Sequence, residues 1–466
     1  MTASKGFEGL SLTKDKKIPV ILDIGTAYTK CGFAGDSCPR HIIPTEVRRY
    51  HSNKITRIFT CDQYSTDELY DVLIDFFKHI YFKLLLVNPR DRRVVVVESL
   101  FSPIQFRKTL AKALFQHYNV PSIMFLPSHL SALLSLGIAT GLVIDCGYEE
   151  TSLLPIVEGI PVMKCWQSLD CGGRALQTEL SCLLKEYAAV TDGETSKPLP
   201  ASKVCLSDEI LEDIIARICF VGKKLTSEQE LHIADDVRQQ MSTTSTQSVP
   251  IPPSVSYPLD GCTTLIIPGI VREKTADLIF KHDKESKSLP TTILDVILKC
   301  PLDVRRSLME NIVVVGGTAM LPGFHDRLMR ELKDIATRGR YAQSLVSRVF
   351  KFHATHVPAN CACWMGGSLH GSVDVLSDHS VSREHFLKTK PNHLPDWMSC
   401  DPSARTVSTA ERSANVVSSL RRLSTPSSTP KLRGRSRSLV SLTPKTGESK
   451  SVSQVPTISE APMSPE

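Results

Sequence analysis

Two short segments of the chain place an acidic residue and a glycine in the same order after an apolar run. The first contains Asp23 and Gly25, and the second contains Asp145 and Gly147. A second apolar stretch follows each glycine, which predicts two strands joined by a tight turn. Such a glycine lets backbone N–H groups approach a phosphate, and an aspartate at the strand end is suited to hold water on Mg²⁺. The repeated arrangement predicts a phosphate site, although a single hairpin of this kind is common in any β-protein.

Two further parts of the sequence are suited to bind a nucleotide. Thr26 lies in the first turn, and the amine of Lys30 could reach a phosphate directly. A third glycine cluster, Gly316-Gly317-Thr318-Ala-Met320, follows a run of valines that predicts a buried strand. A glycine pair at the carboxyl end of a strand permits a flat ligand such as adenine to lie against the backbone. An ordinary tight strand–helix turn would use the same glycines.

The elements that must position these motifs alternate between strand and helix patterns, as in α/β proteins. Ser65 and Glu68 have capping-box spacing ahead of an apolar stripe, which predicts the start of a helix. Ser102 and Gln105 have the same spacing and predict the start of a second helix. Between them, residues 94–97 are a continuous run of valines, typical of a strand buried on both faces.

The positive charge of the chain is concentrated near its end. Residues 401–466 carry ten Lys or Arg and five Asp or Glu, so they account for most of the formal net charge of +6. The nearly neutral remainder argues against a nucleic-acid-binding face. Because the Ser-, Thr- and Pro-rich tail from residue 399 cannot bury enough apolar surface to offset the entropy of ordering, we predict that it is disordered.

Targeting signals and cysteine usage suggest where the protein works. The N-terminus lacks a stretch of signal-peptide length, and no apolar run reaches the roughly 18 residues of a membrane span. The 14 cysteines are scattered without a CxxC pair, which fits a reducing compartment. We therefore expect a cytoplasmic chain without membrane insertion.

The three glycine motifs, in this order, resemble the actin, Hsp70 and sugar-kinase superfamily. From about Pro19 to Trp397 the chain resembles the actin family itself. The segments that carry this resemblance are CGFAGDSCPR (31–40), PIVEGIPV (155–162), CPLDVR (300–305), VVVGGTAMLPGF (313–324) and CWMGGS (363–368). Within the family, residues 81–99, 126–137 and 380–399 are similar to the actin-related subunit at the pointed end of the short filament of dynactin.

The resemblance implies an actin-type α/β fold of two lobes around a nucleotide cleft. The implied organisation begins with a polar leader (1–17) and ends with the tail (399–466). The first lobe comprises residues 18–136, with an outer subdomain at about 45–62, and is completed by residues 352–398. The second lobe comprises residues 137–351, with an outer subdomain at about 186–261. The implied ligand is ATP or ADP with Mg²⁺, held structurally, with Asp23 and Asp145 contacting the ion through water. The implied nucleotide-binding residues are Asp23, Gly25, Thr26, Lys30, Asp145, Gly147, Gly316, Gly317, Thr318 and Met320.

Several positions depart from the actin pattern. The resemblance places the glutamine that orients the attacking water at Ser128, and its partner histidine at Ser152. Neither serine can hold a water as that pair does, so we expect little or no hydrolysis. In the second turn, residues 148–150 are Tyr-Glu-Glu, and the acidic residues should repel phosphate.

Positions that contact the nucleoside in actin also differ. Ile215 and Ala216 replace a lysine and a glutamate that hold adenosine, and Asn360 replaces a lysine beside the adenine. We interpret the site as degraded: we expect it to hold a nucleotide structurally and to hydrolyse it poorly or not at all.

A second departure concerns assembly. Between Pro44 and Pro89 the chain is shorter than actin by roughly fifteen residues, more than ordinary loop scatter. By the resemblance, the missing part is the small outer subdomain and the loop that actin inserts into its neighbour. The groove that receives such a loop is matched by Leu134, Gly137, Ala139, Leu369 and Val373, although each could equally be an ordinary core residue. We expect Leu134→Asp to abolish docking while leaving the fold intact.

These observations favour a structural protein that caps a filament. The resemblance implies as partners an actin or actin-related protein 1 filament subunit, the other pointed-end subunits of dynactin and, indirectly, dynein on microtubules. Two alternatives remain, an ATPase or sugar kinase of the superfamily and a nuclear actin-related protein of a chromatin-remodelling complex. The basic run at 433–438 could serve nuclear import.

The tail contains candidate phosphorylation sites. Arg421-Arg-Leu-Ser424 resembles a basophilic kinase site, and Thr425, Thr429, Thr443 and Ser464 each precede proline. Phosphorylation would cancel local positive charge and weaken attachment to an acidic partner surface. An inert solubilising tail is the alternative.

Overall fold

The structure is a computed structural model. It describes residues 17–48, 55–59, 64–99, 101–192, 195–202, 204–223, 252–282, 287–345, 347–373, 380–388 and 394. All of these belong to the first of two compact units, Met1–Ser424. Among them, no helix is both long and apolar enough to cross a membrane.

The first sheet has six strands in the described residues, in the order β18-β7-β6-β1-β2-β3. They are β1 (Val20–Ile24), β2 (Tyr28–Phe33), β3 (His41–Pro44), β6 (Val94–Glu98), β7 (Ser122–Pro127) and β18 (Val381–Ser382). β1 pairs antiparallel with β2 and parallel with β6. Every residue of β1 and β6 is buried, as predicted for residues 94–97, because helices cover both faces of the sheet.

The helices α1 (Thr66–His79) and α2 (Ile104–Lys112) pack on one face of this sheet. The predicted capping box is confirmed: the Glu68 backbone N–H donates to Ser65 Oγ at 3.3 Å, and the Ser65 N–H donates to the Glu68 carboxylate at 2.9 Å. The predicted cap at Ser102 is wrong. α2 has no side-chain cap, and Gln105 instead donates to the Thr66 hydroxyl, which ties the starts of the two helices together.

The second sheet has the order β10-β9-β8-β16-β17, with β11 paired to β9. Its strands are β8 (Gly141–Cys146), β9 (Thr151–Val157), β10 (Ile160–Pro161), β11 (Gln167–Leu169), β16 (Ile312–Val315) and β17 (Phe352–His353). The helices that follow or cover it include α8 (Leu289–Lys299), α9 (Leu302–Glu310), α10 (Phe324–Ala336) and α11 (Gly339–Ser344). Because β17 pairs with β16, residues 352–353 lie with the second sheet and not with the segment 352–398 predicted to complete the first lobe.

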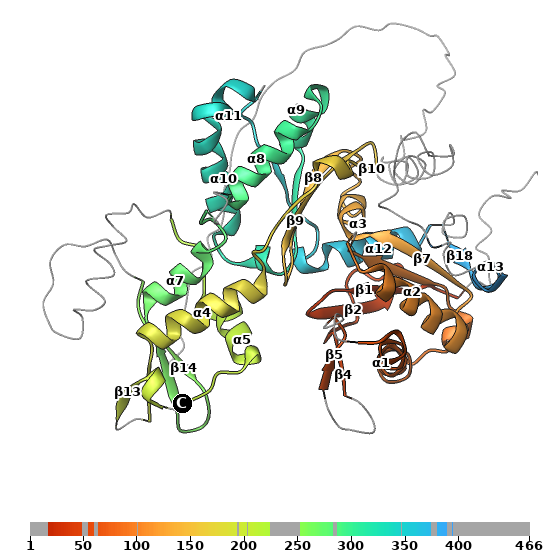
Figure 1. Ribbon diagram of the computed structural model, residues 1–466, viewed down its shortest axis with the longest axis horizontal. Helices are drawn as coiled ribbons and strands as arrows, with labels where there is room; N and C mark the ends of the chain where they lie inside the picture. Colours follow the sequence, from red (N-terminus) through yellow and green to blue (C-terminus); the bar gives the residue numbers. More distant parts are fainter. Residues whose placement is uncertain are drawn as a thin grey trace, which may run out of the picture. The chain divides into compact units, whose positions relative to one another are not determined.

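Each sheet is accompanied by a smaller one. A four-stranded sheet, β13-β12-β15-β14, consists of β12 (Ala189–Thr191), β13 (Ser196–Pro198), β14 (Val255–Pro258) and β15 (Thr264–Ile267). The helices α4 (Gly173–Tyr187), α5 (Asp208–Ile218) and α7 (Gly269–Asp277) accompany it (Figure 1). On the other side, β4 (Glu46–Arg48) and β5 (Ile55–Arg57) form a two-stranded sheet within the described ranges. In the described part of the chain, this sheet is therefore much smaller than the four-stranded one.

Short elements complete the chain. α1 and α2 end in π-helical turns, Ile80–Leu84 and Ala113–His117, and α13 (Arg383–Lys388) lies near the end of the described residues. The 3₁₀ turns are Pro89–Asp91, Met163–Cys165, Leu199–Ser202, Thr318–Met320 and Ala359–Cys361.

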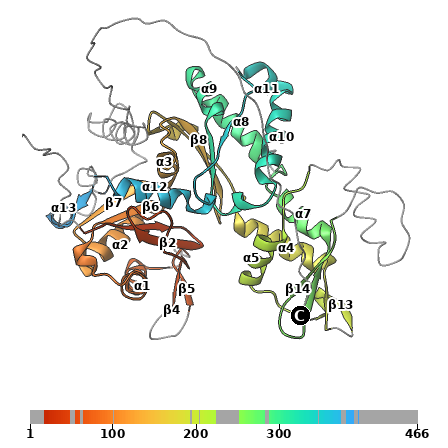
Figure 2. The same cartoon turned by 180° about the vertical axis from the view of Figure 1, so that it is seen from behind.

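The two large sheets share a hydrophobic core that α3 (Ser128–Leu134) and α12 (Ala362–Gly371) complete. Figure 1 and Figure 2 both show α12 beside α3 and the first sheet. The contact is close because Gly366 lacks a side chain: a Cβ there would stand 1.8 Å from the Ser131 carbonyl oxygen. The Ser131 hydroxyl also donates to the Cys363 carbonyl at 2.6 Å.

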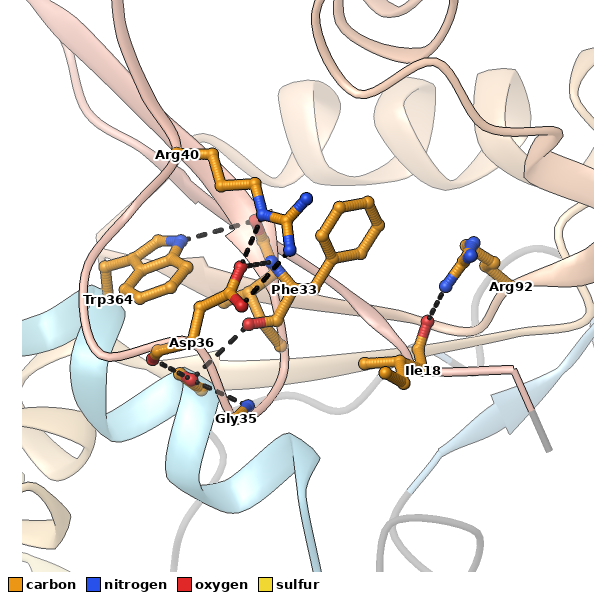
Figure 3. A network of polar contacts seen from close by, with 9 residues as sticks. Ile18, Phe33, Gly35, Asp36, Arg40, Arg92 and Trp364 are labelled. Atoms are coloured by element: carbon orange, nitrogen blue, oxygen red, sulfur yellow. Dashed lines mark hydrogen bonds and ion pairs between the residues drawn. The ribbon is translucent and has the colours of Figure 1, made fainter. Parts of the chain in front are cut away.

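A polar network joins the loop after β2 to α12 (Figure 3). The Asp36 carboxylate accepts hydrogen bonds from the Phe33 N–H at 3.1 Å and from Arg40 Nε at 2.8 Å. From α12, the Ser368 hydroxyl donates to the Asp36 carbonyl at 2.9 Å and accepts from the Gly35 N–H at 3.0 Å. This network fixes the end of the first hairpin against the helix that both lobes share.

Candidate functional site

Both predicted hairpins form, and each places its aspartate opposite a polar residue. In β1–β2, Asp23 pairs with Lys30, whose amine lies 3.0 Å from the Asp23 carboxylate. In β8–β9, Asp145 pairs with Ser152. β16 runs parallel to β8 with Val315 beside Asp145, so the third glycine cluster begins next to the second hairpin.

The charged groups of the first hairpin largely neutralise each other. The side chains of Lys30 and Asp23 are only 14% and 11% exposed, and burial alone would lower the pKa of the lysine. The neighbouring Asp23 carboxylate outweighs that effect and raises the pKa of Lys30 above its ordinary value. Burial raises the pKa of Asp145, so its charged form is costly where it stands. A phosphate would have to compete with Asp23 for the lysine.

The third cluster leaves space for a flat group. Gly316 has φ +97°, and a Cβ there would lie 2.2 Å from the Cys146 carbonyl oxygen, so only glycine fits. At Gly317 no atom lies within 4 Å of where a Cβ would stand. The Thr318 hydroxyl donates to the Gly147 carbonyl at 3.0 Å, which fastens this turn to the second hairpin. Met320, at its end, is half exposed.

Asn360 lies in the 3₁₀ turn beside the same glycines, since the Gly316 N–H donates to the Ala359 carbonyl at 3.1 Å. Its Oδ1 atom is buried and, within the part of the chain that the structure describes, accepts no hydrogen bond. A buried acceptor without a donor is unfavourable. The open space at Gly317 and this unpaired acceptor fit a base with an amino group.

The sequence predicts that the acidic residues of the second turn, residues 148–150, repel phosphate, but the structure gives these side chains partners. The Tyr148 hydroxyl donates to Gln177 Oε1 at 2.8 Å. Glu149 is paired with Arg174 at 2.8 Å, and this pairing reduces the repulsion of phosphate that the sequence predicts. Burial raises the pKa of Glu150, although a hydrogen bond from the Ser168 hydroxyl acts in the opposite direction. All three side chains of residues 148–150 therefore have protein partners.

A small cleft, with a cavity volume of about 90 Å³, lies beside both turns. Its lining residues are Thr26, Ala27, Tyr28, Pro44, Thr45, Glu46, Arg57, Phe59, Tyr148, Glu149, Arg174, Gln177, Asp208, Glu209 and Glu212. Arg57 on β5 pairs across it with Asp208 on α5 at 3.1 Å. Thr26 is thus at the cleft, whereas Lys30, Asp145 and the third cluster are not among its lining residues. On α5, Ile215 packs against the core of the second lobe and Ala216 is exposed.

The residues present fit a nucleotide better at its base than at its phosphates. The base would lie at Gly316, Gly317 and Asn360, and the phosphates beside the turns at Gly25 and Gly147. No three His, Cys, Asp or Glu side chains within the described ranges meet as a metal site. A Mg²⁺ ion held through water by Asp23 and Asp145 stays a prediction.

Sequence reasoning missed His129. Its imidazole lies between the two serines that depart from the actin pattern, with Nε2 3.0 Å from Ser152 Oγ and Nδ1 3.3 Å from Ser128 Oγ. The residue is 1% exposed. A histidine directly after Ser128, at the start of a buried helix, was the available signal.

The predicted filament groove is only partly at the surface. Leu134 and Ala139 are each 3% exposed and belong to the core shared by the two sheets. Gly137 turns the chain after α3 with φ +66°, and Val373 is half-buried. Leu369 is 39% exposed. The expectation that Leu134→Asp would leave the fold intact is therefore wrong, because the new carboxylate would be enclosed in the core.

The tail residues Ser424, Thr425, Thr429, Thr443 and Ser464 lie outside the described residues, so their phosphorylation stays a prediction.

Comparison with known proteins gives two findings. The family model described as "Actin" matches residues 14–390. The chain is also similar to "Actin-related protein 10" of Dictyostelium discoideum, with 28% identity over 445 residues, covering 82% of this chain and 90% of the relative.

Proposed function

This chain belongs to the actin family, and from that premise we propose that it is a structural actin-related protein that caps the pointed end of a short actin-related filament. The proposed filament is that of dynactin, where the protein would support dynein-driven transport on microtubules in the cytoplasm. Its partners would be an actin or actin-related protein 1 subunit of the filament and the other pointed-end subunits. The similarity to actin-related protein 10 supports this assignment.

The observation that carries the proposal is the reduced outer part of the first lobe. β4 and β5 are three residues each, and only six residues, 49–54, connect them. A chain segment of six residues spans at most about 20 Å when fully extended and much less as a hairpin loop. We infer that a connection with so few residues is not donated to a neighbouring subunit. A subunit that receives a loop but donates none ends a filament.

The receiving surface would be centred on Leu369, the most exposed of the predicted groove residues. We expect Leu369→Asp to weaken binding to the filament roughly 100-fold or more, because docking would desolvate an unpaired carboxylate. Co-sedimentation of the variant with purified actin-related filaments measures this effect. Val349→Asp is the matched control, since Val349 is an exposed apolar residue (61%) outside the predicted groove.

Thermal melting of both variants separates lost binding from lost folding. If a well-folded Leu369→Asp binds as tightly as the unmodified chain, the contact lies elsewhere. If the unmodified chain forms filaments alone, it has both complementary surfaces and the cap proposal fails.

We infer further that any bound ATP or ADP is structural. Lys30 and the turn amides near Gly25 and Gly147 would hold the phosphates, and a bound Mg²⁺ would neutralise phosphate charge. The serines at 128 and 152 would not orient an attacking water as the family's glutamine and histidine do.

Purified protein is therefore expected to release phosphate from MgATP no faster than a blank without protein. A coupled phosphate-release assay measures the rate. Steady turnover that Asp145→Ala abolishes would contradict the prediction and favour the ATPase alternative.

A further inference from the structure

The imidazole of His129 bridges two residues that are far apart in the sequence. Ser128 precedes it at the start of α3, and Ser152 lies on β9 opposite Asp145. The distances from the ring nitrogens to the two hydroxyl oxygens are 3.3 and 3.0 Å. The ring thus spans the gap between the serines.

Both nitrogens of the ring are occupied. A neutral imidazole has one N–H donor and one acceptor nitrogen, and here a serine hydroxyl stands at hydrogen-bond distance from each. Burial lowers the pKa of His129, which keeps the ring neutral, although the nearby Asp145 acts in the opposite direction. A ring with both nitrogens engaged has no remaining group to orient a water molecule.

The position of the ring gives this arrangement a functional meaning. Ser128 and Ser152 stand where a hydrolysing actin has the glutamine and histidine that hold the attacking water. Serine side chains alone would leave a polar gap, and a buried water in such a gap typically makes about three hydrogen bonds. The His129 ring occupies that gap and takes up the hydroxyl groups that a water would need.

We propose that His129 excludes the attacking water from the nucleotide site by filling the space between Ser128 and Ser152. The inference rests on the proposed absence of turnover and deepens it. Loss of the two family side chains removes the groups that orient water, and His129 removes the place for the water itself. Restoring the two side chains alone is therefore insufficient to restore hydrolysis.

The test compares two full-length variants with MgATP as the probe. Ser128→Gln/Ser152→His restores both family side chains and keeps His129, while a second variant adds His129→Ala. We expect phosphate release at the level of the blank for the first and at least about ten times faster for the second. The matched control adds His117→Ala in place of His129→Ala, because the His117 side chain is exposed, on the π-helical turn that follows α2. Calorimetric titration with MgATP and thermal melting establish binding and folding for each.

If the variants with and without His129→Ala both bind MgATP and release phosphate at the same rate, the role of His129 is overturned. This holds whether both hydrolyse ATP or neither does. Turnover by the unmodified chain is a different result and contradicts the proposed function instead. His129→Ala alone provides a readout that does not depend on the restored side chains. Its crystal structure should contain an ordered water bonded to Ser128 and Ser152, and a direct contact between the two hydroxyls without water would overturn the inference.

Discussion

Arg327→Leu is expected to destabilise the folded chain by about 3–5 kcal/mol, the range for removing one partner from a buried ion pair. The Arg327 side chain is 8% exposed and pairs with Asp277 and Glu331, which are 10% and 8% exposed. It also donates to the Gly222 carbonyl at 2.9 Å. Leucine would remove the cation that both buried carboxylates contact and the hydrogen bond from α10 to the Gly222 carbonyl.

The midpoint of urea unfolding, followed by circular dichroism, measures this loss. Arg306→Leu is the matched control, because Arg306 pairs with Glu310 at the same four-residue spacing but its side chain is 71% exposed. The control should unfold at the same urea concentration as the unmodified chain, since exposed pairs contribute little. Equal decreases in the urea midpoint of both variants would show that burial does not determine how much the Arg327 ion pairs contribute to stability.

Gly366→Ala is the second substitution with a large expected effect. The added Cβ would lie 1.8 Å from the Ser131 carbonyl oxygen and 2.6 Å from its hydroxyl oxygen, so α3 and α12 would have to separate. Overpacking typically costs about 1–3 kcal/mol, and we expect the upper end because a backbone atom is in the way. The shared core of the two sheets would open with the helices.

Thermal melting measures this effect, with Gly261→Ala as the control. Gly261 has no atom within 4 Å of an added Cβ and no left-handed backbone conformation. We expect a lower melting temperature for Gly366→Ala only. An unchanged melting temperature would mean that α12 can shift on α3 without cost.

Local signals in the sequence predicted those parts of the fold that depend on neighbouring residues. The capping box at Ser65 and the two hairpins at Asp23 and Asp145 are confirmed, because each is formed by residues a few positions apart. The cap at Ser102 has the same spacing as that at Ser65 but is absent. There a contact between the two helices, from Gln105 to Thr66, replaces the local one.

The candidate site was only partly predictable for the same reason. The residues of the glycine motifs could be read from spacing, and the structure brings the second hairpin and the third cluster together. The bridge from His129 to Ser152 joins residues on different elements, and no local pattern indicates it. Likewise, Leu134 appeared to be a groove residue because its apolar type fits both a surface groove and a core. Only the packing of α3 between the sheets distinguishes the two.

The short length of α3 has a mechanical consequence. Seven residues of helix extend about 10 Å, so Ser128 and Leu134 are the two ends of one stiff rod. Its first residue, Ser128, belongs to the candidate nucleotide site, and its last, Leu134, lies in the packed interior beside the predicted docking surface. In a subunit that hydrolyses nucleotide, such a rod could carry a displacement from the phosphates to the neighbour. Here both ends of α3 are buried. Under the proposed function the docking surface would therefore not change with the nucleotide, as a permanent filament cap requires.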